Sequence, residues 1–177
     1  MQNNNILNFI RKPDWISLGN GICGALAIIL SIKNYNPLFP AGFVVAGGIL
    51  DFFDGRVARK YNLASDFGKN LDSLCDIVTF IVAPVVFAFT YIENLSVWET
   101  AVLVFYIAVG LLRLARFNVT GTLSNGKYFE GMPVPFSIGL IVAYFPILHL
   151  SLPMVSWIFL FLIHGGLMIS TVKIRKL

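Results

Sequence analysis

Six long apolar segments joined by short connections are the feature that most limits what this chain can fold into. They are expected at Trp15–Ile32, Leu38–Arg59, Phe67–Ile92, Val97–Phe117, Val134–His149 and Leu152–Val172. About 20 apolar residues suffice to cross a bilayer as a helix. With 57% hydrophobic and only 12% charged residues, the chain carries more apolar surface than one small soluble core can bury. We therefore predict an all-α integral membrane protein with six transmembrane helices in one domain over residues 1–177.

The two ends of the chain are expected to lie at the membrane surface. Residues 1–13 mix isoleucine, leucine and phenylalanine with polar residues, which is typical of a short interfacial amphipathic helix. A cleavable signal peptide is the alternative, with Ala25-Leu26-Ala27 as a cleavage-like site. However, Ser17 and Asn20 interrupt that apolar run, and its apolar character continues past the supposed cut. Residues 173–177 are expected to form a basic cytoplasmic tail after the helix bundle at 15–172.

The placement of positive charge predicts the orientation in the membrane. Of the 13 lysines and arginines, 12 lie in or beside the two ends, the second-to-third connection and the fourth-to-fifth connection, and only Lys33 falls on the other side. The positive-inside rule then puts both termini and these connections in the cytoplasm, in a multi-pass plasma-membrane protein. The net charge of +4 suits an anionic membrane surface. Nucleic-acid binding is not expected, because the basic residues lie at the ends of the spans.

A cluster of acidic residues interrupts this apolar pattern between residues 51 and 76. Asp51 and Asp54 share one face of the second helix, and Asp72 and Asp76 share one face of the third. A single aspartate near the bilayer centre costs roughly 3 kcal/mol, so four would cost on the order of 10 kcal/mol if nothing compensated them. Asp66 follows Ser65 and is expected to cap the third helix instead.

Divalent cations are the compensation that this residue set favours. Carboxylates without histidine or cysteine suit hard, oxygen-seeking ions such as Mg²⁺ or Mn²⁺. Two such ions held side by side are a recurring device for phosphoryl-type displacement. The alternatives are a solvated charged hairpin and a cation transporter. Transport predicts acidic residues spread through the membrane depth, whereas these four lie in one helix pair.

Written as a pattern, the stretch is D-x-x-D-G-x-x-A-R, then eight residues, then G-x-x-x-D-x-x-x-D. This pattern resembles the signature of the CDP-alcohol phosphotransferase family, integral membrane enzymes of phospholipid synthesis. The matching residues are Asp51, Asp54, Gly55, Ala58, Arg59, Gly68, Asp72 and Asp76. The resemblance implies transfer of a phosphoalcohol unit from a CDP-alcohol, commonly CDP-diacylglycerol, to the hydroxyl of a second alcohol, with release of CMP. It also implies a homodimer.

The same resemblance implies roles for the matching residues. The ligands of two Mg²⁺ or Mn²⁺ ions would be Asp51, Asp54, Asp72 and Asp76. Asp76 would also be the general base that acts on the incoming hydroxyl. The contacts to CDP-diacylglycerol would come from Gly55, Ala58, Arg59 and Gly68. Upstream, Ser17 and Asn20 resemble the start of the family's first span and would support the same site, although an interhelical hydrogen bond is an alternative role for Asn20.

Two later motifs predict the acceptor alcohol. The fourth span ends in RLARFN, and FEGMPVP follows in the next connection. This pairing resembles the membrane-type phosphatidylserine synthases within the family, which implies L-serine as the acceptor. Arg113 and Arg116 lie one turn apart and could grip the serine carboxylate together, with Asn118 beside them. Glycerol 3-phosphate or inositol phosphate is the alternative acceptor, and anchoring at the membrane surface is the alternative role of the arginines. His149 and His164 are expected to be structural.

Overall fold

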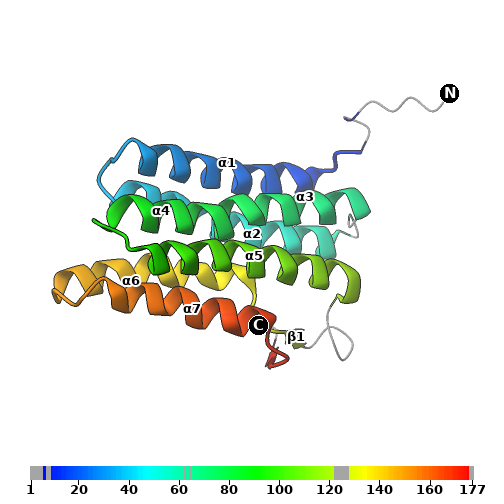
Figure 1. Cartoon of the computed structure of the whole chain (residues 1–177). Helices are drawn as coiled ribbons and strands as arrows, with labels where there is room; N and C mark the ends of the chain where they lie inside the picture. Colours follow the sequence, from blue (N-terminus) through cyan, green and yellow to red (C-terminus); the bar gives the residue numbers. More distant parts are fainter. Residues whose placement is uncertain (1–5, 7–8, 62, 64, 122–127, 176–177) are drawn as a thin grey trace.

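The computed structural model describes residues 6, 9–61, 63, 65–121 and 128–175, and most of them are helical. The elements, in chain order, are α1 (Lys12–Ile32), α2 (Leu38–Lys60), α3 (Asp66–Asp76), η2 (Ile77–Val82), α4 (Ala83–Tyr91), α5 (Val97–Thr120), β1 (Tyr128–Glu130), η3 (Val134–Ser137), α6 (Ile138–His149), α7 (Val155–Ile169) and β2 (Lys173–Arg175). Figure 1 shows the long helices side by side, with the start of α1 and the end of α7 at the end of the bundle that carries β1.

Four of these helical stretches are long and apolar enough to cross a membrane. They are Lys12–Ile32, Leu38–Ala58, Asp66–Tyr91 and Val97–Thr120. Two shorter apolar stretches, Val134–His149 and Val155–Ile169, follow. The prediction of a mainly helical protein with several apolar helices is confirmed. The predicted interfacial helix at 1–13 falls largely outside the described residues, and α1 begins at Lys12.

The third long stretch is one continuous run of α3, η2 and α4, and it changes geometry directly after Asp76. Residues 77–82 are π-helical, a wider turn that often accompanies functional sites. Two neighbouring helices approach this turn closely. A Cβ added at Gly24 of α1 would lie 2.7 Å from the Thr79 Cα, and one added at Gly47 of α2 would lie 2.7 Å from the Thr79 Cγ2. Only glycine at these positions lets α1 and α2 pack against the segment that carries Asp76.

The start of α3 differs in one detail from the sequence prediction. Ser65 is the N-cap residue, and its Oγ accepts a hydrogen bond from the Gly68 N–H at 3.0 Å. Asp66 is instead the first helical residue, where a negative charge interacts favourably with the exposed N–H groups of the first turn. The expectation that Asp66 is the cap is therefore wrong by one residue.

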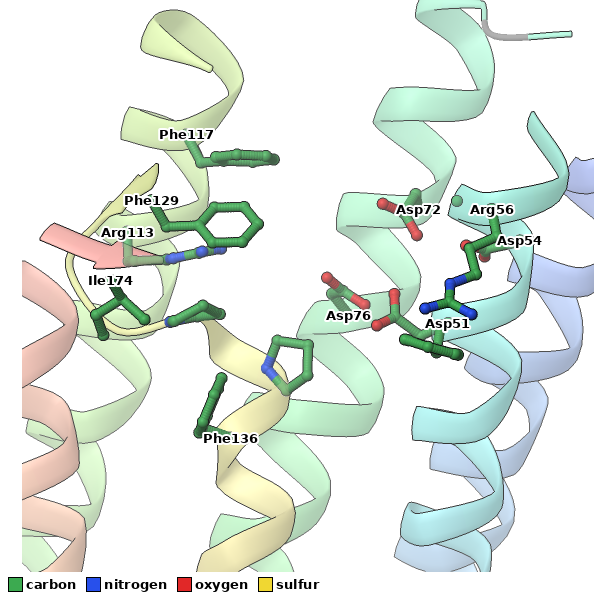
Figure 2. Close-up of a pocket in the computed structure, with 14 residues that line it drawn as sticks. Asp51, Asp54, Arg56, Asp72, Asp76, Arg113, Phe117, Phe129, Phe136 and Ile174 are labelled. Carbon is green, nitrogen blue, oxygen red and sulfur yellow. The ribbon is translucent and has the colours of Figure 1, made fainter. Parts of the chain in front are cut away.

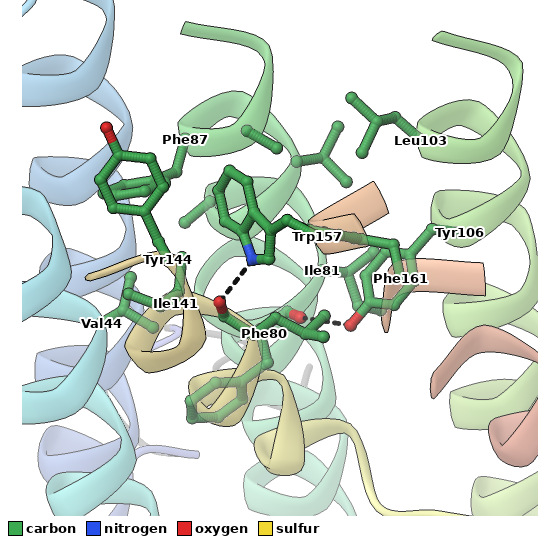
Figure 3. Close-up of a cluster of buried hydrophobic side chains, with 14 of the residues drawn as sticks. Val44, Phe80, Ile81, Phe87, Leu103, Tyr106, Ile141, Tyr144, Trp157 and Phe161 are labelled. Carbon is green, nitrogen blue, oxygen red and sulfur yellow. Dashed lines mark hydrogen bonds between the residues drawn. The ribbon is translucent and has the colours of Figure 1, made fainter. Parts of the chain in front are cut away.

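An aromatic core joins α4, α6 and α7 away from the acidic residues (Figure 3). Phe87 packs edge-on against Tyr144 and Trp157, with ring centroids 5.2 and 5.8 Å apart. Trp157 is fully buried, and its Nε1–H donates to the Leu140 carbonyl at 2.7 Å. This bond satisfies the indole N–H, which would otherwise be costly to bury.

A two-stranded antiparallel sheet is the one part of the described fold that the all-α prediction did not include. In β1 and β2, Tyr128 pairs with Arg175, Phe129 with Ile174 and Glu130 with Lys173. Residues 173–175 of the predicted basic tail therefore form a strand against the connection before α6. Directly after β1, Gly131 has a φ of 72°, a conformation that favours glycine.

Candidate active site

Three carboxylates from α2 and α3 meet at the centre of the candidate site. One oxygen from each of Asp51, Asp72 and Asp76 lies within 4.8 Å of the other two. Figure 2 shows these side chains converging from the two helices. The pairing follows from the sequence, because Asp72 and Asp76 are four residues apart and so project from one face of α3.

Two residues of α1 donate hydrogen bonds to the acidic cluster. The Ser17 Oγ donates to Asp54 Oδ2 at 2.7 Å, and the Asn20 Nδ2 donates to Asp76 Oδ1 at 3.3 Å. All four side chains are buried. Asn20 is itself fixed to the π-helical turn, since its carbonyl accepts a hydrogen bond from the Thr79 hydroxyl at 2.9 Å. Ser17 and Asn20 were predicted to support the site, and in the structure each donates a hydrogen bond to an aspartate of the acidic cluster.

Asp54 lies beside the three-carboxylate group but is not part of it. Its side chain bonds Ser17, and it lines two adjoining cavities. All four predicted metal ligands thus lie together, and three of them bring oxygens close enough to share one ion.

Two cavities adjoin the acidic cluster, and the larger one opens on the side that faces α5. Its volume is about 320 Å³. Four aspartates, Arg56 and Arg113 form its polar wall, and Figure 2 shows the Arg113 guanidinium extending from α5 toward Asp76. The remaining wall is largely apolar and comes from Phe52, Phe117, Phe129, Pro133, Pro135, Phe136 and Ile174.

The second cavity, of about 220 Å³, lies on the other side of Asp54 and Asp72, against α1. Its lining includes four of the residues predicted to contact CDP-diacylglycerol, namely Ser17, Gly55, Ala58 and Gly68. Three residues, Asp54, Gly55 and Asp72, line both cavities. Arg59 lies in α2, but its side chain is outside what the structure describes.

The structure separates Arg113 from the other two predicted acceptor residues. Arg113 is 5% exposed and lies in the larger cavity, with its guanidinium carbon 5.0 Å from the centroid of the Phe117 ring. The Arg116 guanidinium instead donates to main-chain carbonyls of Glu130, Met168, Ile169 and Ser170. Arg116 therefore ties α5 to β1 and to the end of α7, and it lines neither cavity.

Asn118 also turns away from the cavities. Its Nδ2 donates to the Ser73 Oγ at 3.0 Å, and its carbonyl accepts from the Lys69 ammonium at 2.7 Å. Both partners belong to α3, so Asn118 fixes the distance between α3 and α5. Arg113, Arg116 and Asn118 were predicted to contact the acceptor together. Of these three residues, only Arg113 lines the larger cavity.

The residues of the cluster fit a hard divalent cation. Their donor atoms are all carboxylate oxygens, which Mg²⁺ and Mn²⁺ prefer. Among the described residues, the buried Asp72 Oδ1 has no hydrogen-bond partner. A buried carboxylate oxygen without a partner is costly, and a cation would remove that cost.

Some contacts that shape the cavities could not be recognised in the sequence. Phe129, the first residue of the FEGMPVP motif, and Ile174 form one wall because β1 and β2 pair, although they are 45 residues apart. Asp14 is buried at the start of α1, and a Cβ added at Gly68 would lie 2.5 Å from its Oδ1. The contact explains the need for glycine at position 68, but only the packing of α1 on α3 reveals it.

Comparison with known proteins agrees with this arrangement. The chain matches the CDP-alcohol phosphatidyltransferase family over residues 11–171. It is 34% identical to the CDP-diacylglycerol–serine O-phosphatidyltransferase of Methanocaldococcus jannaschii over 171 residues, which are 97% of this chain and 77% of that protein. The Bacillus subtilis protein of the same name is 42% identical over 132 residues, 74% of this chain and 72% of that protein.

A third relative, the Saccharomyces cerevisiae CDP-diacylglycerol–serine O-phosphatidyltransferase, is 37% identical over 146 residues. That alignment takes in 75% of this chain but only 52% of the yeast protein, so the chain spans about half the length of that relative. The family match covers the helices that carry all four aspartates and Arg113, and every lining residue of both cavities except Ile174. The chain therefore belongs to the CDP-alcohol phosphatidyltransferase family.

Proposed function

We propose that this protein is a CDP-diacylglycerol–serine O-phosphatidyltransferase, which makes phosphatidylserine and CMP. The observation that carries the proposal is the presence of one buried arginine, Arg113, in the same cavity as the four aspartates. An acceptor bound there can offer a carboxylate to Arg113 while its hydroxyl faces Asp76. The relatives from M. jannaschii and B. subtilis carry this activity in their names.

The proposed cofactors are two Mg²⁺ or Mn²⁺ ions held by Asp51, Asp54, Asp72 and Asp76. When bound, the ions neutralise the pyrophosphate charge and stabilise the CMP leaving group. The chain's own residues fix the ligands in place. Ser17 holds Asp54, and Asn20 holds Asp76, so the carboxylates are oriented before any substrate enters.

The nucleotide and the acceptor enter from opposite sides of the acidic cluster in this proposal. The cytidine diphosphate occupies the cavity lined by Ser17, Gly55, Ala58 and Gly68, with Arg59 on the same helix as a phosphate contact. Serine occupies the cavity that contains Arg113. The phosphorus bound to diacylglycerol then lies between them, where both cavities share Asp54 and Asp72.

The reaction follows from this placement. The serine hydroxyl loses its proton to Asp76 as its oxygen bonds to the phosphorus that carries diacylglycerol. The bond from that phosphorus to the bridging oxygen breaks, and CMP leaves with that oxygen. Holding the two reactants in line supplies much of the rate enhancement, since alignment matters more here than the basicity of the carboxylate.

The character of the larger cavity favours serine over phosphorylated acceptors. Arg56 and Arg113 are the basic residues in its described lining. Arg56 is exposed and stacks on Phe52, with its guanidinium carbon 3.9 Å from the ring centroid. Glycerol 3-phosphate or inositol phosphate would require more positive charge around a dianionic phosphate. Arg116 and Asn118, predicted from sequence to contact the acceptor, act in this proposal by holding α5 in place.

We further propose six membrane crossings in a single domain, with both termini and the active site on the cytoplasmic side of the plasma membrane. Figure 1 supports an even number of crossings, because α1 begins and α7 ends at the same end of the bundle. The basic residues gather at the ends of the spans on that side. A homodimer, which the family resemblance implies, completes the proposal.

An acceptor panel tests the function. Purified protein in liposomes receives CDP-diacylglycerol, Mg²⁺ or Mn²⁺, and separately serine, glycerol 3-phosphate, inositol or inositol phosphate, and CMP release is measured. We expect release with serine. Release with glycerol 3-phosphate but not with serine would overturn the assignment of the acceptor.

A further inference from the structure

A buried polar pair joins α5 to α7 on the acceptor side of the site. The Tyr106 hydroxyl lies 3.0 Å from the His164 Nδ1. Tyr106 is fully buried and His164 is 5% exposed. Their surroundings are aromatic, since the Phe161 ring packs edge-on against Tyr106 with centroids 5.1 Å apart (Figure 3). Polar groups buried in such a place are costly unless each finds a partner.

The pair touches both segments that shape the acceptor cavity. The Tyr106 hydroxyl reaches the Phe80 carbonyl at 3.5 Å, in the π-helical turn that begins directly after Asp76. The Pro133 carbonyl lies beside the His164 ring, and Pro133 lines the larger cavity. Arg113 follows Tyr106 by seven residues, which is two turns along the same face of α5.

The Tyr106 hydroxyl has one proton, and Nδ1 of His164 at 3.0 Å is a nearer acceptor for it than the Phe80 carbonyl at 3.5 Å. When that proton is directed to Nδ1, the imidazole proton resides on Nε2. Within the described part of the chain, this Nε2 is buried without a hydrogen bond. The Pro133 carbonyl lies beside the ring and accepts from the Phe136 N–H at 3.2 Å, and its second lone pair is the acceptor available to this Nε2–H.

That loop is already docked, directly before Pro133, on α7 and on the segment that follows α7. The Met132 N–H donates to the Leu167 carbonyl at 3.0 Å, and the Gly131 N–H donates to the Val172 carbonyl at 2.9 Å. The loop is therefore anchored as far as Met132. A hydrogen bond from His164 to Pro133 would extend this anchoring to the part of the cavity wall that Pro133 and Pro135 form.

We propose that Tyr106 and His164 are positioning residues for the acceptor subsite. Tyr106 sets the tautomer of His164, and the Nε2–H of His164 holds the Pro133 carbonyl. This holds the wall formed by Pro133 and Pro135 at a fixed distance from Arg113, so that a bound acceptor directs its hydroxyl to Asp76. The inference rests on the proposed function, because it assigns the Arg113 side of the site to the acceptor.

Two substitutions of His164 separate positioning from mere packing. In His164→Gln the side-chain amide occupies the place of Nε2 and can still donate to Pro133. In His164→Asn the amide occupies the place of Nδ1 and can reach only Tyr106. Tyr106→Phe removes the group that sets the tautomer, and Tyr144→Phe is a matched control because Tyr144 is buried in the aromatic core away from both cavities.

The KM for serine and the KM for CDP-diacylglycerol are measured for each variant in liposomes, together with thermal unfolding in detergent. We expect His164→Asn to raise the KM for serine about tenfold, the effect of one lost hydrogen bond, while the KM for CDP-diacylglycerol stays unchanged. His164→Gln should stay close to wild type, Tyr106→Phe should resemble His164→Asn, and Tyr144→Phe should leave both constants unchanged.

Three results would overturn the inference. They are equal changes in both KM values, no difference between the Gln and Asn variants, and a loss of thermal stability without any change in the KM for serine. Wild-type protein that turns over another acceptor instead of serine would overturn the proposed function alone. The positioning of the acceptor by Tyr106 and His164 would then be measured with that acceptor and judged by the same three results.

Discussion

The side-chain amide of Asn20 donates a hydrogen bond to Asp76 at 3.3 Å and links the first helix to the proposed general base. The main-chain carbonyl of Asn20 also accepts a hydrogen bond from the Thr79 hydroxyl, so Asn20 contacts both the last residue of α3 and the π-helical turn that follows it. A carboxylate that must accept a proton from a bound hydroxyl has to point at it, and Asn20 restricts the rotation of Asp76. The structure thus connects a polar residue of the first span to the chemistry of the third.

Replacement of Asn20 by alanine should therefore lower turnover without weakening nucleotide binding. We expect kcat to fall on the order of tenfold for Asn20→Ala, because one orienting hydrogen bond to a charged group is lost. The KM for CDP-diacylglycerol should stay near wild type, and steady-state kinetics in liposomes measure both values. An unchanged kcat would show that Asp76 needs no help from α1.

Ser17 should act on metal binding, because its hydroxyl bonds Asp54 at 2.7 Å. Loss of such an outer partner typically weakens metal affinity by about 10- to 100-fold. We expect Ser17→Ala to raise the Mg²⁺ or Mn²⁺ concentration for half-maximal activity by roughly tenfold or more. Ser31→Ala is the matched control, a buried serine on the same helix that lines neither cavity. Equal metal dependence in the two variants would refute a role for Ser17.

Gly68 tests the proposed nucleotide cavity. A Cβ at this position would lie 2.5 Å from Asp14 Oδ1 and 3.1 Å from the Ser65 Oγ, so Gly68→Ala must displace the wall of that cavity. We expect a higher KM for CDP-diacylglycerol and little change in the KM for serine. At Gly42 of α2 an added Cβ meets nothing within 4 Å, and Gly42→Ala should leave both constants unchanged. A larger effect on serine than on CDP-diacylglycerol would reverse our assignment of the two cavities.

The two arginines near the end of α5 should respond differently to the same substitution. Arg113→Lys keeps the charge but loses the planar fork, and we expect a higher KM for serine with little change in stability. Arg116→Lys cannot satisfy the carbonyls of Glu130, Met168, Ile169 and Ser170 together. We expect that variant to lose about 1–3 kcal/mol of stability with a nearly unchanged KM for serine. Thermal unfolding and acceptor kinetics on both proteins measure the contrast, and a reversed pattern would return Arg116 to the acceptor site.

These contrasts show which parts of the site could be predicted from sequence. The aspartates could be placed because helical geometry alone brings residues three or four apart onto one face. The joint role of Arg113 and Arg116 rested on the same rule, but at position 116 carbonyl groups from β1 and the end of α7 capture the side chain. A spacing rule within one helix contains no information about such distant partners.

The fold shows the same division between local and distant causes. The apolar runs predicted the long helices to within a few residues, because length and hydropathy act locally. Strands of three residues, such as β1 and β2, have too little pattern to be recognised, and they form because two distant segments meet beside α5. His164 was expected to be structural, and only the packing of α7 against α5 reveals its contact with Tyr106.

The identity of the lipid product tests the central claim most directly. Wild-type protein and Asp76→Asn are incubated in liposomes with CDP-diacylglycerol, serine and Mg²⁺ or Mn²⁺, and the lipids are identified by mass spectrometry while CMP is quantified. We predict phosphatidylserine and CMP in equal amounts from wild type. Since a general base contributes about 10²- to 10⁴-fold, the variant should lose at least that lower factor. CMP accompanied by phosphatidic acid, with no phosphatidylserine, or undiminished phosphatidylserine from Asp76→Asn, would contradict the account.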